Sequence, residues 1–178
     1  MQWINALIQG ILLGGLYALL AAGLSLMFGV MRIVNLAHGA LAILAAYLGL
    51  VIVQGTGVSP FIALIAVVPI MAGVGYLLPW GIFNRALTVG GLAPLLAAFG
   101  LAVVLAQLLQ LKFSADSQSL QTGSLGIASI RVTDQISIGV LPLITFLVGV
   151  LVIFGLQMFL SKAPLGRAMR AASDDPET

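Results

Sequence analysis

Four long stretches of this sequence contain no Asp, Glu, Lys or Arg, and they constrain its fold more than any other feature. The stretches are Met1–Met31, Ile33–Asn84, Ala86–Leu111 and Gln135–Ser161. A helix needs about 20 mostly apolar residues to cross the hydrocarbon core of a bilayer. The chain is 61% hydrophobic and 7% charged, whereas soluble domains carry about 25% charged residues. We therefore expect an all-α, polytopic bundle of transmembrane helices.

Polar breaks divide these stretches into five expected spans. The spans are Asn5–Val30, Val34–Val53, Ser59–Phe83, Thr88–Leu111 and Ile136–Leu160. The breaks lie at Met31–Arg32, in the Gly-rich segment 54–57, at Asn84–Arg85 and in the polar segment 112–135. Residues 1–178 are expected to form a single transmembrane domain, in which segment 112–135 is a loop on one side and segment 161–178 a loop on the other.

The basic residues predict the orientation of this domain. Cytoplasmic loops of membrane proteins carry an excess of Lys and Arg. With an external N-terminus, the cytoplasmic side receives Arg32, Arg85, Lys162, Arg167 and Arg170, and the external side receives only Lys112 and Arg131. This distribution favours an N-out, C-in topology, with loop 112–135 external and loop 161–178 cytoplasmic.

Small residues recur every fourth position in the first span. The series is Ala6, Gly10, Gly14, Ala18 and Ala22. Gly and Ala at such spacing let a second helix approach closely. The series favours tight packing against another span or a second subunit over a chance result of the Gly- and Ala-rich composition.

Four prolines, at positions 69, 79, 94 and 142, lie in or near the spans. Proline removes a backbone donor and can break a helix. Freed backbone groups at membrane depth are tolerated where they line a cavity or are buried in protein. The prolines are thus equally compatible with a polar pathway and with ordinary kinks.

The chemistry that the sequence lacks restricts its function. The chain has no cysteine and a single histidine, His38, so we expect no metal site, no cofactor and no enzymatic activity. Proton-coupled carriers need an ionisable group within the membrane, and the expected spans contain none. Seven basic residues are too few for a nucleic-acid surface. The spans suit a neutral or zwitterionic solute whose movement is powered by a partner protein.

Two polar positions stand out around the link between the first two spans. Asn35 is expected to cap the second helix by accepting a backbone N–H, which places His38 in its first turn. His38 is either structural or, as the less favoured alternative, a titrating sensor. Asn35 and Ser25 are the first candidates for contact with a solute.

The C-terminal segment predicts a short amphipathic helix outside the membrane. Leu165, Ala168, Met169 and Ala172 share one helical face. A basic anchor without a partner is the alternative interpretation. The segment Asp175–Glu177 has the pattern of a helix start, which suggests that the sequence continues beyond Thr178.

Several motifs together resemble a known family. The segments concerned are Gly15–Leu19, Gly23–Val30, Ile33–Gly39, Ala45–Tyr47, Leu165–Ala171 and Asp175–Glu177. In order and spacing they resemble the N-terminal half of the LivH-type permeases of bacterial ABC importers for branched-chain amino acids. Asn35, His38 and Gly39 belong to the family motif after the first span.

The resemblance implies a multi-pass permease subunit of the bacterial inner membrane, in the lipid bilayer. Its implied partners are a second permease subunit, cytoplasmic ATPase subunits that bind the ATP, and a periplasmic solute-binding protein. Segment 161–178 would then be the coupling loop that docks on an ATPase. The residues implied in this coupling are Leu165, Gly166, Arg167, Met169, Arg170 and Asp175.

Three departures from the family pattern leave alternatives open. Ala40 replaces a carboxylate that usually follows the His-Gly pair, the segment Asn84–Leu87 is less basic than usual, and the family continues with further spans beyond the coupling loop. A permease for urea or short amides is the nearest alternative. An ATP-independent channel for neutral solutes and a non-functional fragment of a permease are the others.

Overall fold

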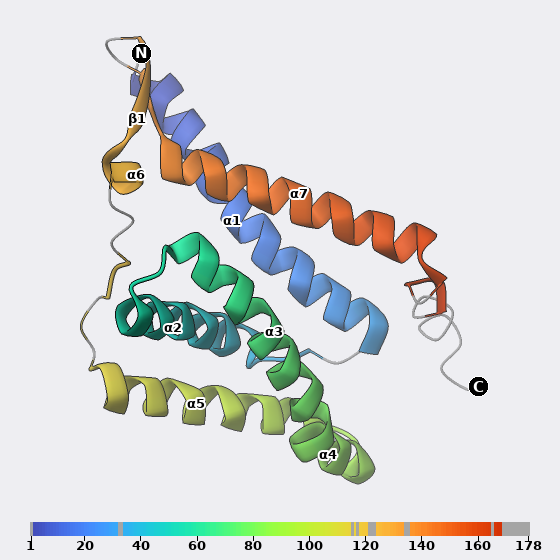
Figure 1. The fold of residues 1–178 in the computed structure, drawn as a ribbon. Helices are drawn as coiled ribbons and strands as arrows, with labels where there is room; N and C mark the ends of the chain where they lie inside the picture. Colours follow the sequence, from blue (N-terminus) through green and yellow to red (C-terminus); the bar gives the residue numbers. More distant parts are fainter. Residues whose placement is uncertain are drawn as a thin grey trace. The chain divides into compact units, whose positions relative to one another are not determined.

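The computed structural model describes residues 2–31, 34–114, 116, 118–120, 124–133, 136–164 and 166–168. Five helices among them are long and apolar enough to cross a membrane, by length and composition. The elements are α1 (Gln2–Met31), α2 (His38–Thr56), α3 (Pro60–Leu78), the π-helical turn η1 (Pro79–Phe83), α4 (Asn84–Val89), α5 (Ala93–Phe113), α6 (Ser124–Ile127), β1 (Ser129–Thr133), β2 (Ile136–Gly139) and α7 (Val140–Lys162) (Figure 1). The expected polytopic helical class is confirmed.

The chain forms two compact units. The first combines residues 1–32 with residues 123–178, and the second is the continuous segment 33–122. The first unit thus contains α1, α6, the two strands and α7. The second unit contains α2, α3, η1, α4 and α5. The prediction of one transmembrane domain over residues 1–178 stays a prediction.

Helices α1 and α7 of the first unit run side by side in the same direction (Figure 1). Gly15 and Gly149 lie where they approach most closely. A Cβ atom on Gly15 would lie 2.5 Å from Phe146 Cδ2, and one on Gly149 would lie 3.2 Å from the carbonyl oxygen of Gly15. Only glycine fits both positions without a shift of the neighbouring helix. The same direction for α1 and α7 agrees with five alternating spans.

The first four members of the small-residue stripe of α1 do not face α7. Ala6, Gly10, Gly14 and Ala18 are exposed, and a Cβ atom on Gly10 or Gly14 would meet nothing within 4 Å, whereas the fifth member, Ala22, is half-buried. The contact with α7 instead involves the face that carries the buried Leu12. Packing of the stripe against a second subunit stays a prediction.

A β-hairpin precedes α7 in the first unit. Strands β1 and β2 pair antiparallel, with Ile130 opposite Ile138. The amide Nε2 of Gln9 donates a hydrogen bond to the carbonyl oxygen of Ser137 (3.1 Å), so the hairpin is tied to α1. The expected fifth span began at Ile136, but residues 136–139 form β2 and α7 begins at Val140. Alternating β-branched residues explain this difference, because they favour strands.

Helices α2 and α3 of the second unit form an antiparallel pair joined by a short turn. Gly57, which ends α2, has a left-handed backbone with φ 70°, a conformation that glycine adopts without steric cost. Gly49 faces Val67, since a Cβ atom at position 49 would lie 3.8 Å from Val67 Cγ2. The predicted break at residues 54–57 is confirmed only at Gly57, because α2 continues through residues 54–56 and the turn occupies residues 57–59.

The third span passes through a wide turn and continues beyond its expected end. The π-helical turn η1 joins α3 to α4 without a break, and the N–H of Asn84 bonds to the carbonyl oxygen of Pro79. The predicted break at Asn84–Arg85 is wrong. The helix continues to Val89 and ends at Gly90 and Gly91, which have φ of 76° and 58°. An exposed charge does not end a helix, whereas consecutive left-handed residues do.

The prolines occupy different places in these helices. Pro69 lies inside α3, Pro79 opens η1, and Pro94 lies in the first turn of α5, where proline is well tolerated. Pro142 lies in the first turn of α7. Only Pro79 therefore coincides with an interruption of regular α-helix.

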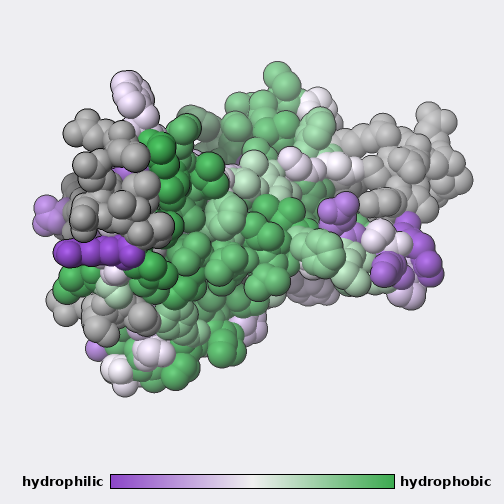
Figure 2. All heavy atoms as spheres, turned by 90° about the horizontal axis from the view of Figure 1, so that it is seen from above, coloured by the Kyte–Doolittle hydropathy of each residue, from purple (hydrophilic) through white to green (hydrophobic). Residues whose placement is uncertain are grey.

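Large apolar side chains cover much of the face shown in Figure 2. Ile65 is 74% exposed, Trp80 75% and Leu111 83%. Extended apolar surfaces of this kind are rare in soluble monomers. They suit helices that are surrounded by lipid and by partner subunits.

Candidate functional site

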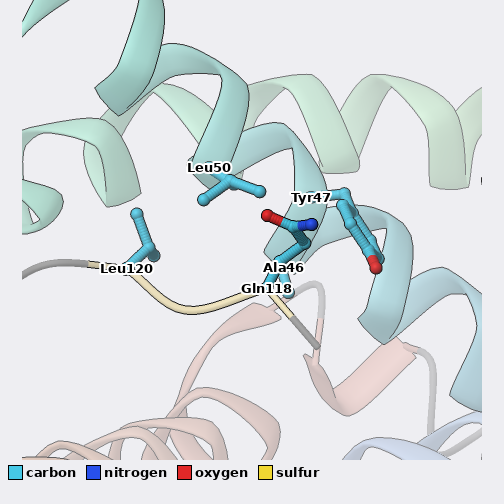
Figure 3. A pocket seen from close by; sticks show the side chains of 5 residues that line it. All are labelled: Ala46, Tyr47, Leu50, Gln118 and Leu120. Atoms are coloured by element: carbon cyan, nitrogen blue, oxygen red, sulfur yellow. The ribbon is translucent and has the colours of Figure 1, made fainter. Parts of the chain in front are cut away.

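Two clefts of the second unit flank Tyr47. The larger, which we name the Tyr47 cleft, has a volume of about 290 Å³ and lies between α2 and α5. Its lining consists of Ala40, Ile43, Tyr47, Ala106, Leu109, Gln110 and Ser114. The smaller, which we name the Gln118 recess, has a volume of about 160 Å³ and is lined by Ala46, Tyr47, Leu50, Gln118 and Leu120. In Figure 3 the amide of Gln118 lies between Leu50 and Tyr47.

An aromatic stack fixes Tyr47 between the two clefts. The rings of Tyr47 and Phe113 stack with centroids 4.4 Å apart and planes inclined by 27°. Offset pairs of this kind stabilise a packed site beyond the area that they bury. The Nζ atom of Lys112 lies 5.7 Å from the centroid of the Phe113 ring, within the range of a cation–π contact. The stack therefore joins the middle of α2 to the end of α5.

Ser114 ends α5 in a strained conformation at the edge of the Tyr47 cleft. Its φ of 65° and ψ of 177° lie in a region that is adopted almost only by glycine. Among the residues that the structure describes, Ser114 is the only one other than glycine with positive φ. Such strain persists where the surrounding structure fixes the backbone, and it concentrates at functional sites.

The Tyr47 cleft also shows which part of α5 lies beside the start of α2. Ala40, the third residue of α2, lines the same cleft as Ala106, the fourteenth residue of α5. Helix α2 therefore begins beside the second half of α5.

The link before α2 contains two buried residues. Asn35 is 5% exposed and Ala37 is fully buried. Non-helical backbone at membrane depth is tolerated only where protein buries it or water reaches it. The side-chain oxygen of Asn35 accepts the N–H of Ala37 (2.9 Å), and its carbonyl oxygen accepts the N–H of His38 (3.1 Å). Asn35 thus stabilises the turn before α2.

This arrangement matches the expected capping role in part. Asn35 accepts a backbone N–H, as predicted, but it is not the N-cap. Helix α2 begins at His38, four residues later than the expected start at Val34, and its N-cap is Ala37, without a side-chain cap bond. His38 is half-buried in the first turn and Gly39 is exposed. Ser25, the other candidate for solute contact, is exposed on α1.

The described part of the predicted coupling loop, residues 161–178, folds back onto α7. Gly166 is buried, and a Cβ atom there would lie 2.7 Å from Leu160 Cα and 3.0 Å from the carbonyl carbon of Phe159. The N–H of Arg167 bonds to the carbonyl oxygen of Ala163 (3.0 Å), while the Arg167 side chain is exposed. The other predicted coupling residues, Leu165, Met169, Arg170 and Asp175, lie outside the described residues.

The side chains around Tyr47 are suited to binding rather than to chemistry. Two amides, a phenol and a hydroxyl supply hydrogen-bond donors and acceptors beside apolar walls. Within the described ranges, no group of three or more His, Cys, Asp or Glu side chains could hold a metal ion. Sequence reasoning missed this cluster, although an amide near the end of an apolar span, as at Gln110, is the signal that could have found it.

Residues 6–178 match the family described as branched-chain amino acid transport system / permease component. The chain belongs to this permease family. The resemblance inferred from the motifs between Gly15 and Tyr47 is thus confirmed. The family is one of permease components of transport systems.

Two named relatives of this permease chain come from bacteria. It is 25% identical over 184 residues to the high-affinity branched-chain amino acid transport system permease protein BraD of Pseudomonas aeruginosa, covering 98% of this chain and 60% of BraD. It is 22% identical over 185 residues to the corresponding LivH protein of Salmonella typhimurium, with the same coverage of both chains. The chain therefore spans about 60% of the length of these relatives. No solved structure matches it.

Proposed function

We propose that this chain forms part of a permease subunit of a binding-protein-dependent ABC importer for branched-chain amino acids. The observation that carries the proposal is the family match over residues 6–178. The relatives BraD and LivH are named for this transport. The five apolar helices supply the membrane-spanning part that such a subunit needs.

The chemistry of the spans supports a substrate without net charge. Among the residues that the structure describes, no Asp, Glu, Lys or Arg lines either cleft beside Tyr47. A charged group moved into an apolar site without a partner pays a large desolvation cost. An amino acid zwitterion can instead bond to amide, hydroxyl and backbone groups.

The energy for transport would come from partner subunits. We expect a second permease subunit, cytoplasmic ATPase subunits that bind ATP, and a periplasmic solute-binding protein. The protein would lie in the bacterial inner membrane with an external N-terminus, and it needs no cofactor and no nucleic acid. Closure of the ATPase dimer would shift the spans between two arrangements through the coupling segment.

Uptake by the complete transporter tests the substrate. The permease is co-expressed with its ATPase and binding protein, and uptake of labelled leucine is measured with and without excess unlabelled urea. We expect ATP-dependent leucine uptake that urea does not inhibit. Uptake of urea alone would assign the chain to the short-amide permeases.

The remaining alternatives give different results in the same system. A self-contained channel would show flux through the purified chain without ATP or a partner. A non-functional fragment would insert poorly and be degraded quickly, which pulse–chase labelling detects. Either result would contradict the proposed role.

Variants of the coupling segment test its role separately. Reversal of charge in the double variant Arg167→Glu/Arg170→Glu should reduce co-purification of the ATPase without loss of membrane insertion. Gly166→Val should have the same effect, because a side chain at Gly166 would collide with the backbone of α7. Gly155→Val is the control, since a Cβ atom there meets nothing within 4 Å. Unchanged co-purification in both variants would contradict the assignment of a coupling segment.

A further inference from the structure

We propose that the Tyr47 cleft is a binding site for the transported amino acid, and that it selects a small zwitterion with a branched aliphatic side chain. Neither the family match nor the named relatives assign residues to such a site. The inference deepens the proposed function and rests on it for the identity of the ligand. The site itself is argued from the residues that line the cleft.

The volume of the cleft limits the size of its ligand. Ligand pockets in proteins usually measure about 300–1,000 Å³, and the Tyr47 cleft has about 290 Å³. Such a volume accommodates a single amino acid. The cleft is therefore large enough for a molecule of the size of leucine.

The walls of the cleft favour an aliphatic side chain. Ile43 and Leu109 supply branched apolar surface from α2 and α5, and Ala106 leaves space beside them. Urea has no apolar surface to bury against Ile43 and Leu109, so these walls would not stabilise it. Leucine or valine would instead bury apolar surface there.

The polar groups at the edge of the cleft suit the two charged ends of a zwitterion. The Gln110 amide offers donors and an acceptor, and the hydroxyls of Ser114 and Tyr47 offer both. A ligand with a net charge would find no opposite charge in this lining. Hydrogen bonds from neutral groups to both ends of the molecule favour a net charge of zero.

Two further features indicate that the site is held in a fixed geometry. The stack of Tyr47 on Phe113 immobilises the ring that separates the cleft from the Gln118 recess. The backbone of Ser114 keeps a conformation that costs free energy. Side chains that are already fixed before a ligand binds lose less conformational entropy on binding. Strain at Ser114 is therefore explained if it holds the hydroxyl at the edge of the cleft.

Thiol labelling tests the site without a transport assay. Because these 178 residues contain no cysteine, a single introduced thiol can be labelled selectively. Ser114→Cys is reacted with a water-soluble maleimide in lipid nanodiscs, with leucine, urea or neither present. We expect leucine to slow the labelling at least about fivefold, which corresponds to roughly 1 kcal/mol of protection, and urea to leave it unchanged.

Ser119→Cys is the matched control for this labelling. Ser119 is exposed, lies five residues beyond Ser114 and lines neither cleft. Its labelling should not respond to leucine. Equal rates for Ser114→Cys with and without leucine would overturn the proposal, and protection of both thiols would show an effect outside the cleft and overturn it as well.

A filled cleft provides a second test, in the complete transporter. Ala106→Phe places a ring into the cleft and should raise the KM for leucine uptake at least about tenfold. Leu108→Phe introduces the same side chain on the same helix at a position that is 57% exposed and does not line the cleft. It should leave the KM unchanged, and equal values for the two variants would contradict the site.

The two tests separate failure of the site from failure of the proposed function. Protection of Ser114→Cys by leucine without uptake by the complete transporter would retain the site and reject the importer. Uptake of leucine that is insensitive to Ala106→Phe would retain the importer and reject the site. Absence of both protection and uptake would reject both.

Discussion

Gly15 and Gly149 determine how closely α1 and α7 approach in the first unit. Substitution Gly15→Leu forces the added side chain into Phe146, whose Cα lies 3.3 Å from the position of a new Cβ. Overpacking of this kind costs about 1–3 kcal/mol. We expect a lower unfolding temperature for the purified protein in detergent, measured by the loss of helical circular dichroism.

Gly14→Leu is the matched control, because a Cβ atom at Gly14 meets nothing within 4 Å and the residue is exposed. Its unfolding temperature should equal that of the wild-type chain. If the small-residue stripe packs against a second subunit, this variant should weaken the association of subunits instead. Equal destabilisation by both substitutions would show that the α1–α7 contact is not where the structure has it.

Asn35 is a second position where one side chain has a defined structural task. Asn35→Ala leaves the buried N–H of Ala37 without its acceptor, and an unsatisfied buried donor costs about 1–3 kcal/mol. We expect faster proteolysis of the link before α2 and a lower unfolding temperature. Asn35→Ser should recover part of the loss, because a serine hydroxyl can accept the same bond. Equal effects of Ala and Ser would contradict this role.

At the scale of residues, the sequence predicted the role of a single side chain more reliably than the residues that it contacts. It predicted that Asn35 would accept a backbone N–H, and the structure has that bond. It did not identify the stack of Tyr47 on Phe113, because 66 residues separate them and no periodicity links them. It selected the regular stripe on α1 as a packing face, whereas α7 packs where Gly15 and Leu12 lie. The choice among helix faces depends on the partner helix, which a single segment of sequence does not contain.

At the scale of elements, the turn between α4 and α5 depends on glycine. Gly90 has φ 76° and ψ −173°, a conformation that costs other residues about 1–3 kcal/mol. Gly90→Ala should therefore destabilise the second unit. Gly73→Ala, in the interior of α3 where a Cβ atom meets nothing within 4 Å, should stabilise it slightly, by up to about 1 kcal/mol. Thermal unfolding of both variants measures this difference in sign, and the same sign for both would contradict it.

The five spans were predictable because uncharged apolar length is a local property of sequence. The residues at which the spans end were less predictable. The end of the third span at Gly90 was missed because Arg85 suggested an earlier break, although the Gly90–Gly91 pair was the better signal. The β-hairpin had a visible signal in the alternation of isoleucine with polar residues from Ile136 to Ile138. The π-helical turn at Pro79 had none, because it depends on how one extra residue is accommodated within the helix.

At the scale of the whole molecule, the positive residues predict the orientation of the chain. Thr56→Cys, at the end of α2, should react with a membrane-impermeant maleimide in intact cells. Thr88→Cys, near the end of α4, should react only after the membrane is opened. The cytoplasmic excess of basic residues, with Arg85 near Thr88, is the physical reason. The opposite pattern of labelling would establish an N-in topology.

The division into two units has a consequence for how the chain is made. The second unit is one continuous segment, whereas the first unit joins two segments on either side of it. At a synthesis rate of about 5–20 residues per second, the roughly 110 residues between Met31 and Val140 separate the release of α1 from that of α7 by about 5–20 s. During this interval the helices of the second unit can already assemble.

Helix α1 is therefore synthesised well before α7, the helix against which it packs. Its face around Gly15 lacks the contact with Phe146 until α7 has been synthesised. A ribosome stalled before Val140 would carry a complete second unit and a first helix that has not yet met α7. Such a nascent chain is the species that membrane proteases and chaperones would meet whenever synthesis of this permease fails.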